Sequence, residues 1–235
     1  MLVNNTHASI KERVVALLLA VILPLFGYLI VGYYTNGNNT NQLETDIDTL
    51  VPMSAAWVFT YILMYVLSLA PICAISNISL LKRWVLNVGV MYMIAIPVWI
   101  LLPVGVPRIH LEGDSFGVFL LGIIQFLDPP TNCFPSMHVA VATLSALVIR
   151  DVDKCIGSLI LCAVPPIWYS TIAVGQHWAV DGIAGAVLAV TTYIMVSKGL
   201  PLSRQAFGRI ERLYHFVWVL LFIVPVFLLW FIWKQ

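Results

Sequence analysis

Charge is scarce in this sequence. Asp, Glu, Lys and Arg together make up 10% of its 235 residues, while hydrophobic residues make up 61%. A soluble domain carries roughly 25% charged residues. The apolar runs are about 20 residues long and lack the ten-residue alternation of a membrane β-barrel. These features exclude an ordinary soluble protein and a barrel. They predict an all-α, polytopic transmembrane helical bundle in the lipid bilayer.

Other absences narrow the function. The net charge is +1, and no basic patch with interleaved aromatics is present, so we expect no nucleic-acid partner. No internal repeat or linker divides the chain, which predicts a single integral membrane domain over residues 1–235. The cysteines have no metal-ligand spacing, and we interpret them as small buried hydrophobic residues rather than a disulfide framework. They are Cys73, Cys133, Cys155 and Cys162.

Six or seven apolar segments are long enough to cross a membrane. They are residues 14–34, 55–75, 84–102, 133–149, 155–174, 178–197 and 214–233. The first has no evident cleavage site and is interpreted as a retained span. The apolar piece 115–127 is too short to cross, and we expect it to lie in the interface or to re-enter between helices.

The basic residues predict the orientation. If the seven spans alternate, ten of the twelve Lys and Arg residues fall on one side, which the positive-inside rule makes cytoplasmic. The N-terminus is then cytoplasmic, in a plasma or inner membrane. Arg108 and Lys234 fall on the other side. That side also holds the acidic residues Glu44, Asp46, Asp48, Glu112, Asp114 and Asp128. The same assignment places His138, His177 and Asp181 at span ends on the extracytoplasmic face.

Ionisable residues bordering a membrane span indicate a functional site. His177 and Asp181 are four residues apart, so on a helix both would lie on one face. A carboxylate there orients an imidazole and leaves its other nitrogen free as a nucleophile or base. A His–Asp pair that merely joins helices is the competing interpretation, with about equal weight.

Residues 135–138, Pro-Ser-Met-His, precede another apolar run. Ser136 is a plausible helix N-cap, and the N–H groups of Ser136, Met137 and His138 would then form an anion site. His138 in that first turn could donate a proton to a leaving oxygen, although a histidine that simply faces water or headgroups is the commoner case. Arg108 suits bidentate phosphate binding, and headgroup binding is its alternative role.

Small residues are frequent in two of the predicted spans. They allow close helix approach and would pack the span 178–197 against the span 133–149. That packing would bring His177 within reach of His138. The small residues are Gly182, Ala184, Gly185, Ala186 and Ala189 in one span, and Ala140, Ala142, Ser145 and Ala146 in the other.

Taken together, the Pro-Ser-Met-His motif and His177-x-x-x-Asp181 resemble the type-2 phosphatidic acid phosphatase superfamily, most clearly over about 84–197. The resemblance implies a six-helix core, here with one additional span, and a metal-independent lipid phosphatase or phosphotransferase that needs no cofactor. Its substrate would be a membrane lipid phosphate ester. His177 would form a phosphohistidine, Asp181 would orient it, and His138 would protonate the leaving alcohol. Ser136, Met137 and Arg108 would bind the phosphate.

The sequence departs from the family pattern at its cations. Leu101 stands where the first motif has lysine, and Thr171 stands where the third has arginine. Gln176 or His110 is a candidate replacement. With fewer cations to bind the phosphate, the sequence is similar to the headgroup-transferase branch, which includes inositol phosphorylceramide synthases. Fewer cations suit a phosphodiester donor. Hydrolysis is the commoner outcome in the superfamily, so hydrolase and transferase stay open.

Two other functions compete with a phosphohistidine enzyme. A zinc hydrolase would ligate the metal through His138, His177 and Asp181, with a fourth ligand from His110, Glu112 or Asp114. A non-catalytic relative that binds lipid headgroups or acts in transport is the third possibility, supported by Leu101 and Thr171. The lipid itself and the oligomeric state are not encoded in any recognisable pattern.

Overall fold

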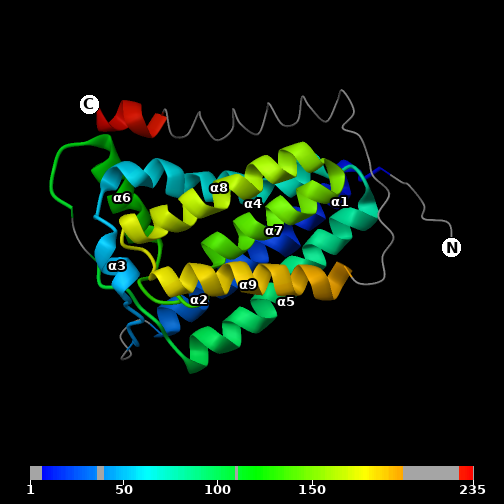
Figure 1. Ribbon diagram of the computed structural model, residues 1–235. Coiled ribbons are helices and arrows are strands. Elements are labelled where there is room, and N and C mark those ends of the chain that lie inside the picture. The colour runs from blue at the N-terminus through cyan, green and yellow to red at the C-terminus, as the bar shows by residue number, and fades with distance from the viewer. Residues whose placement is uncertain (1–6, 36–39, 109–110, 198–227, 235) are drawn as a thin grey trace.

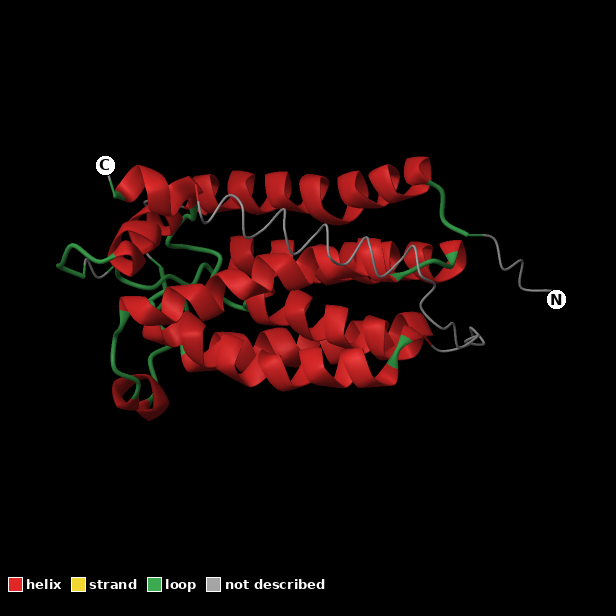
Figure 2. Ribbon diagram, turned by 90° about the horizontal axis from the view of Figure 1, so that it is seen from above, coloured by secondary structure: helices red, strands yellow, loops and turns green. Residues whose placement is uncertain are grey.

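In the computed structural model, residues 7–35, 40–108, 111–197 and 228–234 are described, and they confirm an all-α bundle. Its long helices run side by side along one axis (Figures 1 and 2). The elements are α1 Ile10–Leu17, the π-helical turn η1 Leu18–Ile22, α2 Leu23–Thr35, α3 Asp46–Leu50, the short 3-10 turn η2 Ala55–Trp57, α4 Val58–Ala74, α5 Ile78–Leu101, α6 Phe116–Leu127, α7 Met137–Val152, α8 Lys154–Ala173 and α9 Ala179–Ser197.

Five helical stretches among the described residues are long and apolar enough to cross a membrane. They are Ile10–Thr35, Ala55–Ala74, Ile78–Leu101, Lys154–Ala173 and Ala179–Val196. Each overlaps one of the predicted spans. The predicted span 214–233 lies mostly outside the described residues, as does His110.

The predicted span 133–149 is the central helix of the bundle. α7 packs against α4, α8 and α9, and Figure 1 shows it between them. It has 16 residues, Met137–Val152, which is short for a membrane crossing. Its residues are mostly buried, His138 and Thr143 included. A helix surrounded by other helices is positioned by protein contacts rather than by lipid, so its length need not match the bilayer.

The basic residues Lys82 and Arg83 lie inside a helix rather than in the loop that the sequence predicted. α5 begins at Ile78 because the Asn77 side-chain oxygen accepts the N–H groups of Ser79 and Leu80, at 2.8 and 3.1 Å. This cap extends the helix beyond the apolar run. Arg83 is consequently buried, and its guanidinium lies 3.5 Å from a carboxylate oxygen of Asp151 on α7.

The short apolar piece 115–127 forms α6, which packs on η2 and α4 at one end of the bundle (Figure 1). Ser115 begins this helix by accepting the Val118 N–H at 3.3 Å. α3 lies at the same end of the bundle. The loops and the helix starts at this end carry the residues that the sequence singled out.

Close packing of α9 on its neighbours depends on glycine, as predicted. A Cβ atom on Gly185 would lie 2.2 Å from the Ser136 carbonyl oxygen. A Cβ atom on Gly182 would lie 2.0 Å from the Trp168 ring of α8. A side chain at position 185 would therefore push α9 away from the start of α7, and a side chain at position 182 would collide with Trp168 of α8.

Candidate active site

His177 is positioned by the way in which α8 ends. Gly175 has φ +66°, a left-handed conformation that glycine adopts without strain. The Gly175 N–H then donates to the Ile172 carbonyl at 2.8 Å, and the Gln176 N–H donates to Thr171 at 2.9 Å. The same Thr171 carbonyl accepts the His177 N–H at 3.1 Å. This Schellman motif turns the chain and fixes the backbone of His177 in the loop before α9.

The helical geometry predicted for His177 and Asp181 is therefore wrong in detail, because His177 precedes α9. The two side chains meet across the start of the helix. Asp181 Oδ2 accepts the Trp178 N–H at 2.8 Å and lies 3.4 Å from His177 Nδ1. Asp181 is fully buried at 0% exposure. One carboxylate thus starts α9 and faces the imidazole.

The protonation of His177 follows from its neighbours. Its Nδ1 faces the Cys133 carbonyl oxygen at 3.0 Å as well as Asp181 Oδ2. Both partners only accept hydrogen bonds, so Nδ1 carries the proton. In the neutral ring, Nε2 then holds the lone pair. That nitrogen lies 2.8 Å from His138 Nδ1. The geometry presents an oriented nucleophilic nitrogen to a second histidine.

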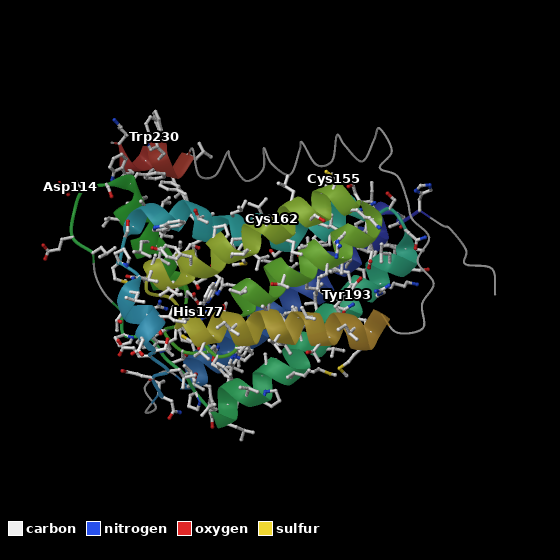
Figure 3. The ribbon with its side chains drawn as sticks, in the orientation of Figure 1. Asp114, Cys155, Cys162, His177, Tyr193 and Trp230 are labelled. Atoms are coloured by element: carbon white, nitrogen blue, oxygen red, sulfur yellow. The ribbon has the colours of Figure 1, made fainter. Side chains whose placement is uncertain are left out.

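His138 is in the first turn of α7, as predicted, and connects His177 to α4. Its Nε2 lies 2.7 Å from the Tyr61 hydroxyl. The rings of His138 and His177 have centroids 5.0 Å apart. Figure 3 shows His177 near the end of the bundle that carries α3 and α6, with Tyr193 toward the other end of α9.

The anion site predicted for the start of α7 is only partly available. The Ser136 N–H donates to the Asp181 carbonyl at 2.9 Å and is not free. Ser136 is the N-cap residue, yet its hydroxyl makes no cap hydrogen bond and is buried without a partner among the described residues. Met137 packs in the main hydrophobic core with Ala140. The Ser136 hydroxyl is therefore one group here that has a hydrogen bond to offer.

Arg108 reaches the site from the loop after α5. Its Nη1 donates to the Gln176 side-chain oxygen, and its Nη2 donates to the Asp128 carbonyl at 2.7 Å. Arg108 Nε and Gln176 Nε2 are buried with no partner among the described residues. Buried donors without partners are costly. Together with the Ser136 hydroxyl, they form a set of donors suited to phosphate oxygens.

The comparison with protein families agrees with these motifs. A model described as the PAP2 superfamily matches residues 42–195, which is more than half of the chain. The chain belongs to the PAP2 superfamily. Its members are phosphoesterases, which supports a phosphatase-type activity in general terms. No curated protein and no solved structure matches the sequence.

The structure shows where the two residues that depart from the PAP2 pattern lie. Leu101 ends α5 with 83% exposure and takes no part in the site. Thr171 is buried at 0%, and its hydroxyl donates to the Trp168 carbonyl at 2.7 Å. Neither position supplies a substitute donor. Gln176 does enter the site, as suggested, through its bond to Arg108.

A pocket of about 300 Å³ opens beside His177. Its lining residues come from α3 and the chain around it, from the end of α8, and from the loops after α5 and α8. They are Gln42, Glu44, Asp48, Val51, Met53, Val106, Pro107, Ile172, Gly175, His177 and Trp178. Asp48 also accepts the Ala179 N–H at 2.7 Å, so its carboxylate stabilises the positive end of the α9 dipole. The pocket gives His177 a route to the surface.

Three buried side chains have the ligand types of a zinc site. Atoms of Cys133, His177 and Asp181 lie within 4.8 Å of one another. This set differs from the predicted one, because His138 is bonded to His177 instead, and Glu112 and Asp114 are exposed. Burial raises the pKa of the Cys133 thiol well above its ordinary value, so a metal ion would first have to displace a proton.

Two residues of the site were missed by the sequence. Tyr61 lies within an apolar span, and in the sequence Asp128 is only one of several acidic residues on the predicted outer side. The Tyr61 hydroxyl lies 3.4 Å from Asp128 Oδ2, and Tyr28 donates to Asp128 Oδ1. The one available signal was Asp128 itself, an acidic residue directly after the apolar helix α6.

Proposed function

We propose that this PAP2 superfamily protein transfers the phosphoryl group of a membrane lipid phosphate ester, first to His177 and then to an acceptor hydroxyl. The observation that carries the proposal is the state of His177. Its Nδ1 proton is held by Cys133 and Asp181, and its Nε2 lone pair faces His138 at 2.8 Å. A neutral, oriented imidazole is the form that attacks phosphorus.

The neighbours of His177 have complementary roles in this reaction. Attack by Nε2 opens its bond to His138, which leaves the His138 Nδ1 proton free for the leaving oxygen. Arg108, Gln176 and the Ser136 hydroxyl donate to the phosphoryl oxygens as charge develops on them. The second step regenerates His177 when water or an alcohol attacks the phosphohistidine.

The choice between hydrolysis and transfer depends on the cations. Arg108 is the cation that the described residues bring into hydrogen-bond contact with the site, and the two further positions carry Leu101 and Thr171. A phosphodiester carries one negative charge fewer than a phosphomonoester. The reduced clamp therefore favours a second candidate function, the transfer of a lipid headgroup phosphate to an alcohol.

We place the reaction on the extracytoplasmic face. The site lies where α8 ends and α9 begins, whereas Arg150 and Lys154 lie where α7 ends and α8 begins. Figure 3 shows Cys155 at the end of the bundle away from His177. Arg150 and Lys154 thus lie at the opposite end, which the positive-inside rule makes cytoplasmic.

A lipid panel tests the function. Purified protein is incubated with phosphatidate, phosphatidylglycerol phosphate, an isoprenoid diphosphate, phosphatidylinositol and ceramide, and both free phosphate and new phospholipid are measured. Turnover of at least one lipid phosphate, acid-labile labelling of the protein and inhibition by vanadate are expected. All three should disappear in His177→Ala. Turnover that persists in this variant would refute the phosphohistidine mechanism, and a protein inactive on the whole panel would support the non-catalytic alternative.

A further inference from the structure

The hydrogen bonds of His138 continue away from the phosphoryl site. Its Nε2 lies 2.7 Å from the Tyr61 hydroxyl, which lies 3.4 Å from Asp128 Oδ2. Tyr28 donates to the other oxygen of Asp128. These residues come from α2, α4, the end of α6 and the start of α7, so four segments build one chain of polar groups. None of the family motifs includes Tyr28, Tyr61 or Asp128.

The hydrogen bonds between these polar groups can all be donated in the same direction, toward His177. His177 Nδ1 donates to Cys133 and Asp181, so His177 Nε2 accepts from His138 Nδ1. A neutral His138 with its proton on Nδ1 has a lone pair on Nε2, which accepts the Tyr61 proton. Tyr61 has a single proton, and it is used in this bond. A Tyr61 hydroxyl that donates to His138 has no second proton for Asp128 Oδ2, so with this His138 tautomer the 3.4 Å contact requires a proton on Asp128.

The surroundings of Asp128 agree with this assignment. Burial is the largest influence and raises the pKa of Asp128 above its ordinary value, while the hydrogen bonds with Tyr28 and Tyr61 and the nearby Arg108 and His177 oppose the shift. Arg108 Nη2 also donates to the Asp128 backbone carbonyl at 2.7 Å. The titratable and charged groups that act on Asp128 or on its tyrosine partners are Tyr28, Tyr61, Tyr65, Arg108, Cys133 and His177. A carboxylic acid beside a fixed cation can release its proton and remain stabilised.

We infer that Asp128, acting through Tyr61, resupplies the proton that His138 gives to the leaving oxygen, an inference that rests on the proposed function. In the first step the His177 Nε2–phosphorus bond forms and the bond from phosphorus to the leaving oxygen breaks. The His138 Nδ1 proton moves to that oxygen, the Tyr61 proton moves to His138 Nε2, and the Asp128 proton moves to Tyr61. When the acceptor hydroxyl attacks phosphorus, its proton enters at His138 Nδ1, and the sequence runs in reverse.

The relay has a physical advantage in this buried site. His138 passes a proton without ever becoming an imidazolium beside His177 and Arg108, because one nitrogen gains a proton as the other loses one. A charged ring at that position would be costly to bury. Asp128 and Tyr61 are then positioning and proton-storing residues, while His138 is the group that contacts the leaving oxygen.

The test compares two substrates with one phosphoryl group and different leaving groups. Dioctanoyl phosphatidate needs a proton on its leaving oxygen, whereas 4-nitrophenyl phosphate does not. In Asp128→Asn, an amide still donates to Tyr61 but cannot release a proton. We expect kcat on phosphatidate to fall about a hundredfold, within the usual range for loss of a general acid. KM should stay within a few-fold, and 4-nitrophenyl phosphate turnover should stay within about threefold of wild type.

Tyr61→Phe keeps the aromatic ring but removes the hydroxyl that connects Asp128 to His138, so it should show the same substrate-dependent loss. Tyr92→Phe is the matched control. Tyr92 packs against Trp99 with ring centroids 6.0 Å apart, and this variant should behave as wild type on both substrates. An equal loss on both substrates, or no loss on either, in Asp128→Asn would overturn the relay while leaving the function intact. A wild-type protein that turns over neither these two substrates nor any lipid of the panel above would overturn the proposed function and the relay with it.

Discussion

Asp181 Oδ2 lies 3.4 Å from His177 Nδ1 and at the same time accepts the Trp178 N–H at 2.8 Å. The carboxylate therefore does two things at the start of α9: it satisfies an N–H group of the helix start, and it faces the imidazole that would attack phosphorus. These two contributions respond differently to substitution. Stability should depend on the hydrogen bond with Trp178, whereas catalysis should depend on the carboxylate charge beside His177.

Asp181→Asn should separate the two contributions. An asparagine oxygen still accepts the Trp178 N–H, so the melting temperature should change little. The loss of negative charge should lower kcat by about two orders of magnitude, because His177 loses the partner that stabilises its proton. Asp181→Ala should lose activity similarly and also lose about 1 kcal/mol of stability with the cap. Thermal unfolding and kcat of both variants in detergent check this. A fully active Asp181→Asn would contradict an orienting role.

Arg108 and Gln176 should act as a unit, because Arg108 Nη1 donates to the Gln176 oxygen. Arg108→Ala should lower kcat/KM about a hundredfold by removing the cation of the phosphate clamp. Gln176→Ala should lower it about tenfold. Residues in one hydrogen-bond network are not additive. The double variant should therefore be little worse than Arg108→Ala, and losses that multiply would show that the two residues act independently.

Asp128 should make stability depend on pH in a defined direction. Burial raises the pKa of Asp128 in the folded protein, so the folded state binds the proton more tightly than the unfolded chain does. Its contribution is then fully present below the unfolded pKa, about 3.9. It is lost as pH rises through the higher folded pKa. Asp128→Asn does not ionise, so its melting temperature should rise relative to wild type between pH 4 and pH 8. A pH-independent difference would contradict a protonated Asp128.

Metal removal distinguishes the phosphohistidine mechanism from a zinc hydrolase. Phosphohistidine chemistry at His177 needs no metal, so dialysis against a chelator should leave turnover unchanged. Loss of activity that zinc restores would instead support a metal site at Cys133, His177 and Asp181. Cys133→Ser then serves as the matched variant: it should be as active as wild type in the phosphohistidine mechanism and inactive in a zinc enzyme.

The long helices were predictable because their apolar runs approach the thickness of a bilayer, which holds for Lys154–Ala173 and Ala179–Val196. Hydropathy does not detect helix-capping residues, so the predicted start of α5, residue 84, lies beyond its actual start at Ile78. Asn77 starts the helix at Ile78 and draws Arg83 into a buried ion pair with Asp151. Hydropathy likewise does not predict the bounds of α7, because contacts with α4, α8 and α9 position this helix.

The motif residues of the site were predictable from local spacing, whereas their surroundings were not. The position of His177 depends on the left-handed Gly175 and on the Thr171 carbonyl, and no sequence pattern predicts these backbone contacts. Tyr61 and Asp128 reach His138 through tertiary packing between separate segments. No pattern of spacing within one segment encodes a contact of that kind.

The approach of α9 to α7 makes a last prediction, on Gly185. A Cβ atom there would lie 2.2 Å from the Ser136 carbonyl oxygen, which is backbone and has little room to move. Gly185→Ala should therefore separate the two helix starts, displace His138 from His177 and cost a few kcal/mol of stability, as overpacking does. Gly89→Ala on α5 is the matched control, because a Cβ atom there meets nothing within 4 Å. The control should be as stable as wild type or slightly more so, since alanine favours a helix over glycine by about 1 kcal/mol. If Gly185→Ala keeps wild-type activity and melting temperature, the contact between α7 and α9 does not hold the two histidines together.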